Sequence, residues 1–241
     1  MPLEDLRGER RTFFGDPVLD HALPAVNEAF WSALIEHVGS NPVSQAGAIL
    51  DVGCHTGGLL EQLCLRFQPT DVFGIEPLAA ARDAARRRLE GSAARVTLLD
   101  TSEWSRVPAA KIDLITSHET LYLEPDLRAF MVHLRAVLAP SGLAFIVLGC
   151  HSENPLWQQW KVPLIAAGHL VYDHSPIEIM HAAASAGLLP SVQPLRRAGW
   201  ITYDPLRADF HYPDVRTMFD HHYRHKLIFR LRVADDRNMS S

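Results

Sequence analysis

The chain has 241 residues, a length that fits one large α/β domain or two small ones and is sufficient to bury a sizeable core. Apolar residues make up 47% of it and charged residues 21%, proportions that are ordinary for a globular enzyme. The formal net charge of -5 gives no overall attraction for a polyanion, so no nucleic-acid partner is expected.

The N-terminal stretch is charged where a signal peptide would need an apolar core, and no apolar run approaches the roughly 20 residues that span a bilayer. We therefore expect a cytoplasmic protein without a membrane partner. Residues 1–17 show no periodicity, and we expect them to form a mobile arm. The sequence does not indicate whether this arm closes over a ligand. From Leu23 to Val38 the apolar residues recur at helical spacing, with Pro24 in a first turn, so residues 1–40 predict an arm and a helix.

Short apolar runs then alternate with helical patterns. The predicted strands are 48–52, 72–75, 96–99, 112–115 and 143–148, and the predicted helices are 59–67, 78–89 and 127–138. The last of these helices is stopped by Pro140-Ser141-Gly142. This alternation predicts βαβ units with right-handed crossovers and a parallel sheet.

Beyond residue 150 the regular alternation ends. Residues 152–174 carry aromatic side chains without a strand period and predict an insertion above the sheet, whereas Ser175-Pro176-Ile177-Glu178 predicts a helix that begins with a capping box. Two apolar runs, Val192–Tyr203 and Lys226–Val233, predict a long antiparallel hairpin without a comparable helix between them. The predicted organisation is a single domain, 1–241, made of the arm and helix at 1–40, a cofactor-binding core at 45–150, and substrate-side insertions with sheet-closing strands at 151–241.

The run Asp51-Val52-Gly53-Cys54-His55-Thr56-Gly57 follows the first predicted strand and precedes a helix. It places backbone N–H groups at the carboxyl edge of the sheet, where open α/β sheets bind ligands. The glycine spacing differs from the dinucleotide fingerprint. An aspartate directly after the strand suits a ligand with an ammonium group and would repel a pyrophosphate.

This run resembles the first motif of the class I S-adenosylmethionine-dependent methyltransferases, an apolar strand followed by D/E-x-G-x-G-x-G. Asp51, Gly53 and Gly57 match it, and His55 occupies the position of the usual middle glycine, where it is expected to push the methionine end of the cofactor or narrow the pocket. Residues after the next three strands, and Leu138–Gly142, resemble later motifs in order and spacing. The resemblance implies a Rossmann-like, doubly wound, mostly parallel seven-stranded sheet with an antiparallel C-terminal hairpin strand, and S-adenosylmethionine as cofactor with S-adenosylhomocysteine as product.

The resemblance also implies cofactor-binding roles at successive strand ends. Glu76, which ends the second strand, is expected to accept hydrogen bonds from both ribose hydroxyls, and Asp100 is expected near the adenine amino group. The full predicted set is Asp51, Gly53, Cys54, His55, Gly57, Glu76, Pro77, Asp100, Thr101 and Ser117.

Methyl transfer requires an aligned, desolvated acceptor and, for a hydroxyl, removal of a proton. His118 and His151 both follow strand ends at the binding edge, and an imidazole titrates near neutrality, so both are candidate catalytic bases. Each could instead orient an acceptor or bind loop backbone. The candidate substrate-binding residues are aromatic, and they either wall the acceptor site or form a small core under the insertion: Tyr122, Trp157, Trp160 and Trp200.

No metal site is predicted, because the three cysteines lack CxxC spacing and the histidines at 211, 221, 222 and 225 have no recognised ligand order. The predicted function is transfer of a methyl group to oxygen or nitrogen of a small molecule, with no particular oligomeric state indicated. Two alternatives stay open. A nicotinamide-dependent oxidoreductase would bind a dinucleotide, and a non-catalytic S-adenosylmethionine-binding module would bind S-adenosylhomocysteine without turnover.

Overall fold

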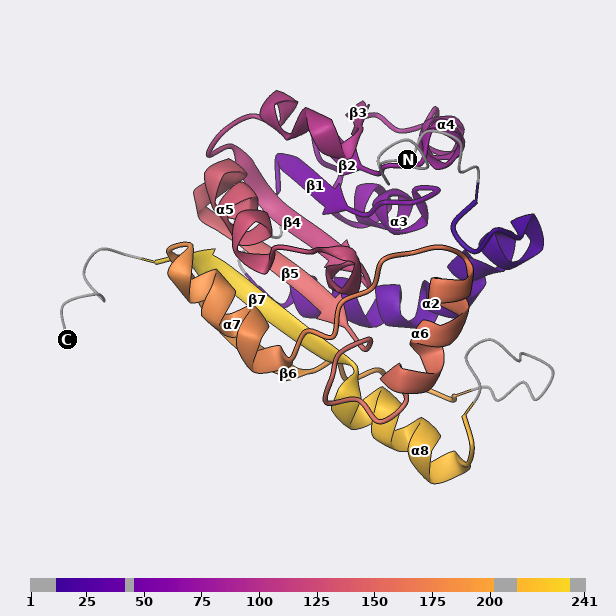
Figure 1. Ribbon diagram of the computed structural model, residues 1–241. Coiled ribbons are helices and arrows are strands. Elements are labelled where there is room, and N and C mark those ends of the chain that lie inside the picture. Colours follow the sequence, from indigo (N-terminus) through magenta and orange to yellow (C-terminus); the bar gives the residue numbers. More distant parts are fainter. Residues whose placement is uncertain (1–11, 42–45, 202–211, 235–241) are drawn as a thin grey trace, which may run out of the picture.

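A computed structural model describes residues 12–41, 46–201 and 212–234. Its centre is a seven-stranded sheet in the order β3-β2-β1-β4-β5-β7-β6 (Figure 1). The strands are β1 (Ala48–Val52), β2 (Asp71–Ile75), β3 (Arg95–Leu99), β4 (Ile112–His118), β5 (Leu138–Leu148), β6 (Leu188–Pro194) and β7 (Leu227–Val233). Strands β1 to β5 pair in parallel, and β7 runs antiparallel to both of its neighbours. The predicted mostly parallel sheet with one antiparallel C-terminal strand is therefore confirmed.

Helices cover both faces of this sheet (Figure 1). They are α2 (Pro17–Gly39), α3 (Gly58–Phe67), α4 (Ala79–Arg88), α5 (Leu127–Val137), α6 (Trp157–Ala166), α7 (Pro176–Ser185) and α8 (Val215–Asp220). Short 3₁₀ turns lie at Thr101–Arg106 (η1) and Leu121–Leu123 (η2), and a π-helical turn lies at His221–His225 (η3). None of the helices in the described part of the chain is long and apolar enough to cross a membrane.

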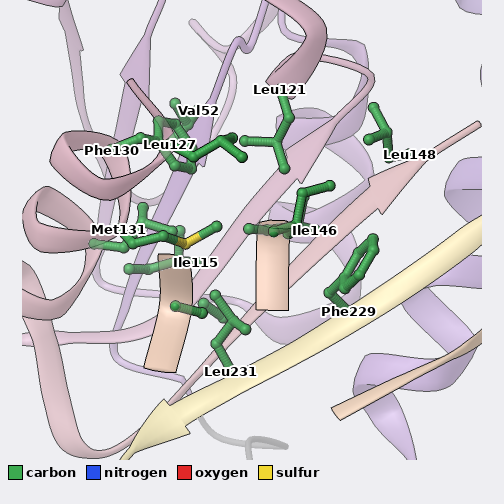
Figure 2. Close-up of a cluster of buried hydrophobic side chains, with 14 of the residues drawn as sticks. Val52, Ile115, Leu121, Leu127, Phe130, Met131, Ile146, Leu148, Phe229 and Leu231 are labelled. Carbon is green, nitrogen blue, oxygen red and sulfur yellow. The ribbon is translucent and has the colours of Figure 1, made fainter. Parts of the chain in front are cut away.

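The core has two halves, one on each face of the sheet. On one face, α5 packs Phe130 and Met131 against strand residues such as Ile115 and Ile146 (Figure 2). On the other face, α2 and α3 cover Leu114 and its neighbours. Burial on both sides explains why the strands read as nearly continuous apolar runs, as parallel strands do.

The ends of several elements differ from the prediction. Helix α2 begins at Pro17, because Asp16 caps it by accepting a hydrogen bond from the Val18 N–H at 2.7 Å, and Pro24 lies inside the helix. Residues 1–11 of the predicted arm lie outside the described part. Strand β5 begins at Leu138, and its pairing with β4 jumps to Leu143, so the predicted turn is a bulge within the strand.

The C-terminal hairpin is also shifted. Its first strand is β6 rather than Val192–Tyr203, and Pro190 is tolerated there because β6 is an edge strand. Residues 202–211 lie outside the described part. Between the two strands, where no helix comparable to the earlier ones was predicted, the structure has the short helix α8 and the turn η3 before β7. With six residues, α8 is too short to give a helical period in the sequence.

Candidate functional site

Two glycines shape the turn between β1 and α3. Gly53 has a φ of 79°, and a Cβ there would lie 2.1 Å from Cγ2 of Thr120. Gly57, also at 79°, caps α3, and a Cβ there would approach Ala85 to 3.0 Å. Left-handed backbone together with close packing explains these two glycines of the motif. His55 is left-handed as well, with a φ of 45°.

Two buried carboxylates, Asp51 and Glu76, lie at the ends of the neighbouring strands β1 and β2. Asp51 accepts a hydrogen bond from the hydroxyl of Thr116 at 2.7 Å, and burial, with the nearby charge of Glu76, raises its pKa to about 7. Glu76 accepts hydrogen bonds from the N–H groups of Leu78 at 2.9 Å and His55 at 3.1 Å. Burial raises the pKa of Glu76 in spite of these bonds. Both carboxyl groups are thus less acidic than usual.

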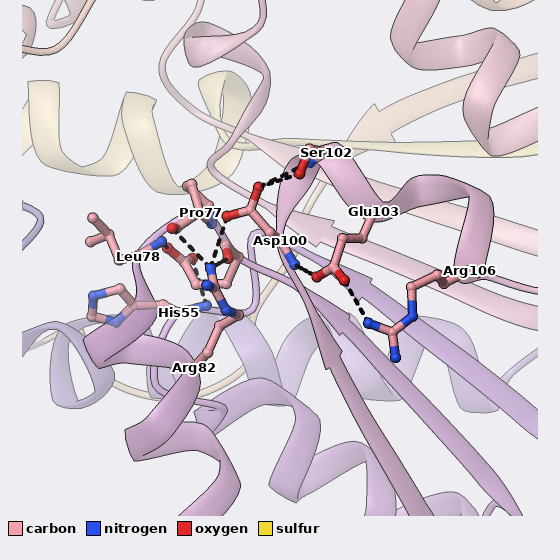
Figure 3. Close-up of polar contacts among 9 residues, drawn as sticks. His55, Pro77, Leu78, Arg82, Asp100, Ser102, Glu103 and Arg106 are labelled. Atoms are coloured by element: carbon pink, nitrogen blue, oxygen red, sulfur yellow. Dashed lines mark hydrogen bonds and ion pairs between the residues drawn. The ribbon is translucent and has the colours of Figure 1, made fainter. Parts of the chain in front are cut away.

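Asp100 has a structural partner, Arg82 (Figure 3). The guanidinium donates to Asp100 Oδ2 at 3.1 Å and to the Pro77 carbonyl at 2.8 Å. The other oxygen of Asp100 accepts from the N–H and hydroxyl of Ser102, each at 3.0 Å. Although partial burial opposes it, these bonds lower the pKa of Asp100. Asp100 therefore caps η1 and holds the strand ends together, while its neighbour Thr101 reaches the cavity.

A cavity of about 590 Å³ opens at this edge of the sheet. Its size suits one drug-sized organic ligand. The lining residues that come from the ends of the first three strands and the start of α3 are called the first end here: Asp51 to Thr56, Gly58, Leu59, Ile75 to Leu78 and Thr101. The remaining lining residues are called the second end: Phe13, Leu23, Pro24, Asn27, Trp31, His118 to Thr120, Tyr122 to Glu124, Gly168 to Leu170 and Tyr172.

His118 lies in the wall at the second end of the cavity, next to α2. Its ring is 6.4 Å from that of Trp31 at an angle of 78°. Its Nε2 is buried and has no hydrogen-bond partner within the described structure. Burial and the charge of Lys226 lower the pKa of His118 to about 3, so its imidazole is neutral at physiological pH.

Glu119 and Lys226 form a buried ion pair behind His118. Glu119 also accepts hydrogen bonds from the N–H groups of Gly149 at 2.7 Å and Cys150 at 3.3 Å. The ammonium group of Lys226 lies 4.2 Å from the ring centre of Phe30. This pair ties the ends of β4, β5 and β7 together.

Several predicted site residues lie away from the cavity. His151 is buried, and its Nε2 is bound to the carbonyl of His225 at 2.8 Å. Trp157 and Trp160 belong to the core, where the indole N–H of Trp157 donates to Asp173 at 2.6 Å. Trp200 is 95% exposed. Gly57, Asp100 and Ser117 support the cavity from behind without lining it.

The predicted residues that do line the cavity are Asp51, Gly53, Cys54, His55, Glu76, Pro77, Thr101, His118 and Tyr122. Sequence reasoning missed Trp31 and Asn27, whereas it placed Glu119, just past the fourth strand, and Tyr172, in the predicted insertion, near the site without committing to a role for either. The amphipathic pattern of α2 marks its buried face but gives no sign that one end of that face borders a cavity. Of the four histidines considered as metal ligands, His211 lies outside the described residues. Among the described residues, no group of three or more His, Cys, Asp or Glu side chains could hold a metal ion.

Known proteins resemble this chain in sequence and in fold. The family described as "Methyltransferase domain" matches residues 26–188. A trans-aconitate 2-methyltransferase of Paracidovorax citrulli is 26% identical over 71% of this chain and 81% of its own length. Other relatives of that name match over less than half of their length.

Two solved structures show the same fold at low sequence identity. A methyltransferase in complex with the Haloferax volcanii Trm112 methyltransferase activator has a TM-score of 0.75 at 16% identity, over 93% of this chain and 98% of that one. A geranyl diphosphate methyltransferase in complex with S-adenosylmethionine has a TM-score of 0.60 at 22% identity, over 92% and 93%.

Proposed function

This chain belongs to the methyltransferase domain family and is an S-adenosylmethionine-dependent methyltransferase, and we propose that it methylates an oxygen atom of a small, uncharged molecule beside His118. The family and the sheet order argue against the oxidoreductase alternative, because the dinucleotide-binding sheet has the order 3-2-1-4-5-6 without an inserted antiparallel strand. The observation that carries the choice of acceptor is the unpartnered Nε2 of His118.

The first end of the cavity fits the cofactor. Glu76 keeps free acceptor positions beside its two backbone bonds and would hold the ribose hydroxyls, while Asp51 would face the ammonium group. Gly53 packs so closely against Thr120 that a side chain would not fit, so at this position the turn presents only backbone to the cavity. Bound here, S-adenosylmethionine supplies a strongly electrophilic sulfonium methyl group.

The second end of the cavity fits a hydroxyl acceptor. A buried ring nitrogen without a partner is costly, and an O–H group would satisfy it once the cavity wall that covers Nε2 moves to admit the group. A hydroxyl oxygen becomes strongly acidic once it is methylated, so even an imidazole with a pKa of about 3 can take its proton. The same imidazole could not deprotonate an ammonium group, which argues for oxygen over nitrogen.

The charge of the cavity bears on the class of acceptor. The names of the relatives refer to small molecules, trans-aconitate and geranyl diphosphate, which supports a small acceptor. Among the described residues that line the cavity there is no Lys or Arg, and of the two glutamates at its second end Glu119 is already paired with Lys226, which leaves the carboxylate of Glu124. A tricarboxylate such as trans-aconitate would therefore find no counter-charge on these residues, and we expect an uncharged alcohol or phenol.

Two measurements test this proposal. Calorimetric titration should show binding of S-adenosylhomocysteine and no binding of NAD. Release of S-adenosylhomocysteine should then be measured with a panel of phenols, alcohols, amines and carboxylic acids that includes trans-aconitate. We expect turnover of a hydroxyl compound, strongly reduced in His118→Gln and unchanged in His181→Gln, which alters an exposed histidine on α7. Turnover restricted to amines or carboxylates, or full activity of His118→Gln, would refute the proposal.

A further inference from the structure

His55 occupies a backbone position that favours glycine. Its φ is 45°, in the left-handed region, which disfavours a side chain with a Cβ. The backbone N–H of His55 donates to Glu76 Oε2 at 3.1 Å, so this residue is in direct contact with the carboxylate assigned to the cofactor. A strained histidine at such a place calls for a compensating contact elsewhere.

The side chain of His55 faces the start of α2. Its Nε2 is 3.8 Å from Asp20 Oδ2, and its ring lies edge-on to Phe13, with ring centres 6.3 Å apart. The Asp20 carboxylate also accepts hydrogen bonds from the N–H groups of Phe13 at 2.5 Å and Phe14 at 2.9 Å. Asp20 therefore links the cofactor turn to the segment that precedes the helix.

That segment, residues 12–20, is called the strap here, and it reaches the opposite wall of the cavity. The carbonyl of Phe13 accepts a hydrogen bond from Nε2 of His169 at 2.6 Å, and the two rings lie 4.2 Å apart with an angle of 35°. Phe13, His55 and His169 all line the cavity. A continuous series of contacts thus runs from Glu76 through His55, Asp20 and Phe13 to the segment after α6.

We propose that His55 is a positioning residue that couples cofactor binding to closure of the strap over the cavity. A ligand bonded to Glu76 fixes the carboxylate and with it the backbone of His55, whose side chain then holds Asp20 and Phe13 in place. By reciprocity the closed strap raises the affinity for the ligand. The strap must open before the ligand can leave, so closure also slows release, and it shields the reacting groups from water. The inference rests on the proposed function in one respect, the assignment of the cofactor to this cavity.

The test compares dissociation rates of S-adenosylhomocysteine, measured by stopped-flow fluorescence. His55→Gly relieves the backbone strain and should fold, and His55→Asn keeps a residue that tolerates left-handed backbone. We expect both variants to release the ligand about tenfold faster. Gln68→Gly is the matched control, because Gln68 is an exposed residue with a φ of 49° at the end of α3. It relieves similar strain and should leave the rate unchanged.

A double variant separates coupling from a general loss of order. Phe13→Ala should speed release as His55→Asn does, and the combined variant should release the ligand no faster than either single variant, because both break the same series of contacts. Hydrogen exchange of the Phe13 and Phe14 amides should slow on ligand binding in the wild type and not in His55→Asn. Unchanged release from both His55 variants, or multiplicative effects in the combined variant, would overturn the inference while leaving the proposed function intact. Failure of the wild type to bind the ligand would overturn both.

Discussion

The substitution Lys226→Met removes the cation of the buried ion pair and leaves Glu119 in place. The side chains of Lys226 and Glu119 are 4% and 17% exposed, so water can replace the lost ammonium group only partly. Glu119 would keep its bonds to the N–H groups of Gly149 and Cys150 but would lose its counter-charge. The variant should therefore be less stable than the wild type at neutral pH.

Two estimates of the loss agree. Burial alone would raise the pKa of Glu119, but Lys226, His118 and the N–H group of Gly149 together outweigh it, and the pKa falls from 4.5 to about 2. That difference corresponds to about 3 kcal/mol of stability at pH 7. Deleting one partner of a buried ion pair costs about 3–5 kcal/mol in other proteins. We expect the free energy of unfolding to fall by about 3 kcal/mol.

Urea unfolding followed by tryptophan fluorescence measures this loss. The double variant Glu119→Gln/Lys226→Met removes both charges and should recover most of the stability. Lys161→Met breaks the more exposed pair with Asp173 and should cost less than about 1 kcal/mol. A cost below about 1 kcal/mol for Lys226→Met, or a double variant no more stable than the single one, would refute the reasoning.

The same pair gives the pH dependence of stability a definite sign. The folded pKa of Glu119 is depressed, so its contribution is present above pH 4.5 and is lost as the pH falls from 4.5 towards 2. His118 acts in the same direction at higher pH, because its folded pKa of about 3 is below the unfolded value of 6.5. In Lys226→Met the acid loss between pH 4.5 and 2 should be smaller than in the wild type.

Two further predictions concern the cofactor end of the cavity. The pKa of Asp51 is about 7, and a protonated carboxyl group cannot pair with an ammonium group, so the affinity for S-adenosylhomocysteine should fall as the pH drops below 7. Calorimetric titration at several pH values should show a flatter pH dependence for Asp51→Asn than for the wild type. The same pH profile in both proteins would argue against this role of Asp51. Gly53→Ala places a Cβ 2.1 Å from Thr120 Cγ2 on left-handed backbone and should lower both the melting temperature and the affinity for S-adenosylhomocysteine. Adding Thr120→Ser to this variant removes the Cγ2 methyl group and should restore part of each loss. A Gly53→Ala variant with wild-type affinity would contradict the packing argument.

Local signals in the sequence predicted most of the sheet and one end of the site. The β1 strand was predicted with its observed bounds because burial on both faces gives a continuous apolar run, and α5 was predicted because burial on one face gives a helical period. The helix start at Ser175 was predicted because its capping box is complete within four residues. Gly53 and Glu76, which both line the cavity, stand at a turn and a strand end that short segments of the sequence fix locally.

Features that depend on contacts between distant segments could not be read in this way. His118 and His151 follow strand ends alike, yet only His118 reaches the cavity, because residues near β7 enclose His151. Trp157 and Trp160 have aromatic side chains suited to a binding wall, but α6 turns them into the core.

The chain by itself thus determined where strands β1 to β5 lie along the sequence and which residues stand at their ends, since both follow from periodicity and turn chemistry within short segments. Only the tertiary structure decided the second end of the cavity. It is assembled from α2, the end of β4 and the segment after α6, which lie far apart in the sequence. The role of His55 has the same origin, because its partner Asp20 comes from a helix more than thirty residues earlier in the chain.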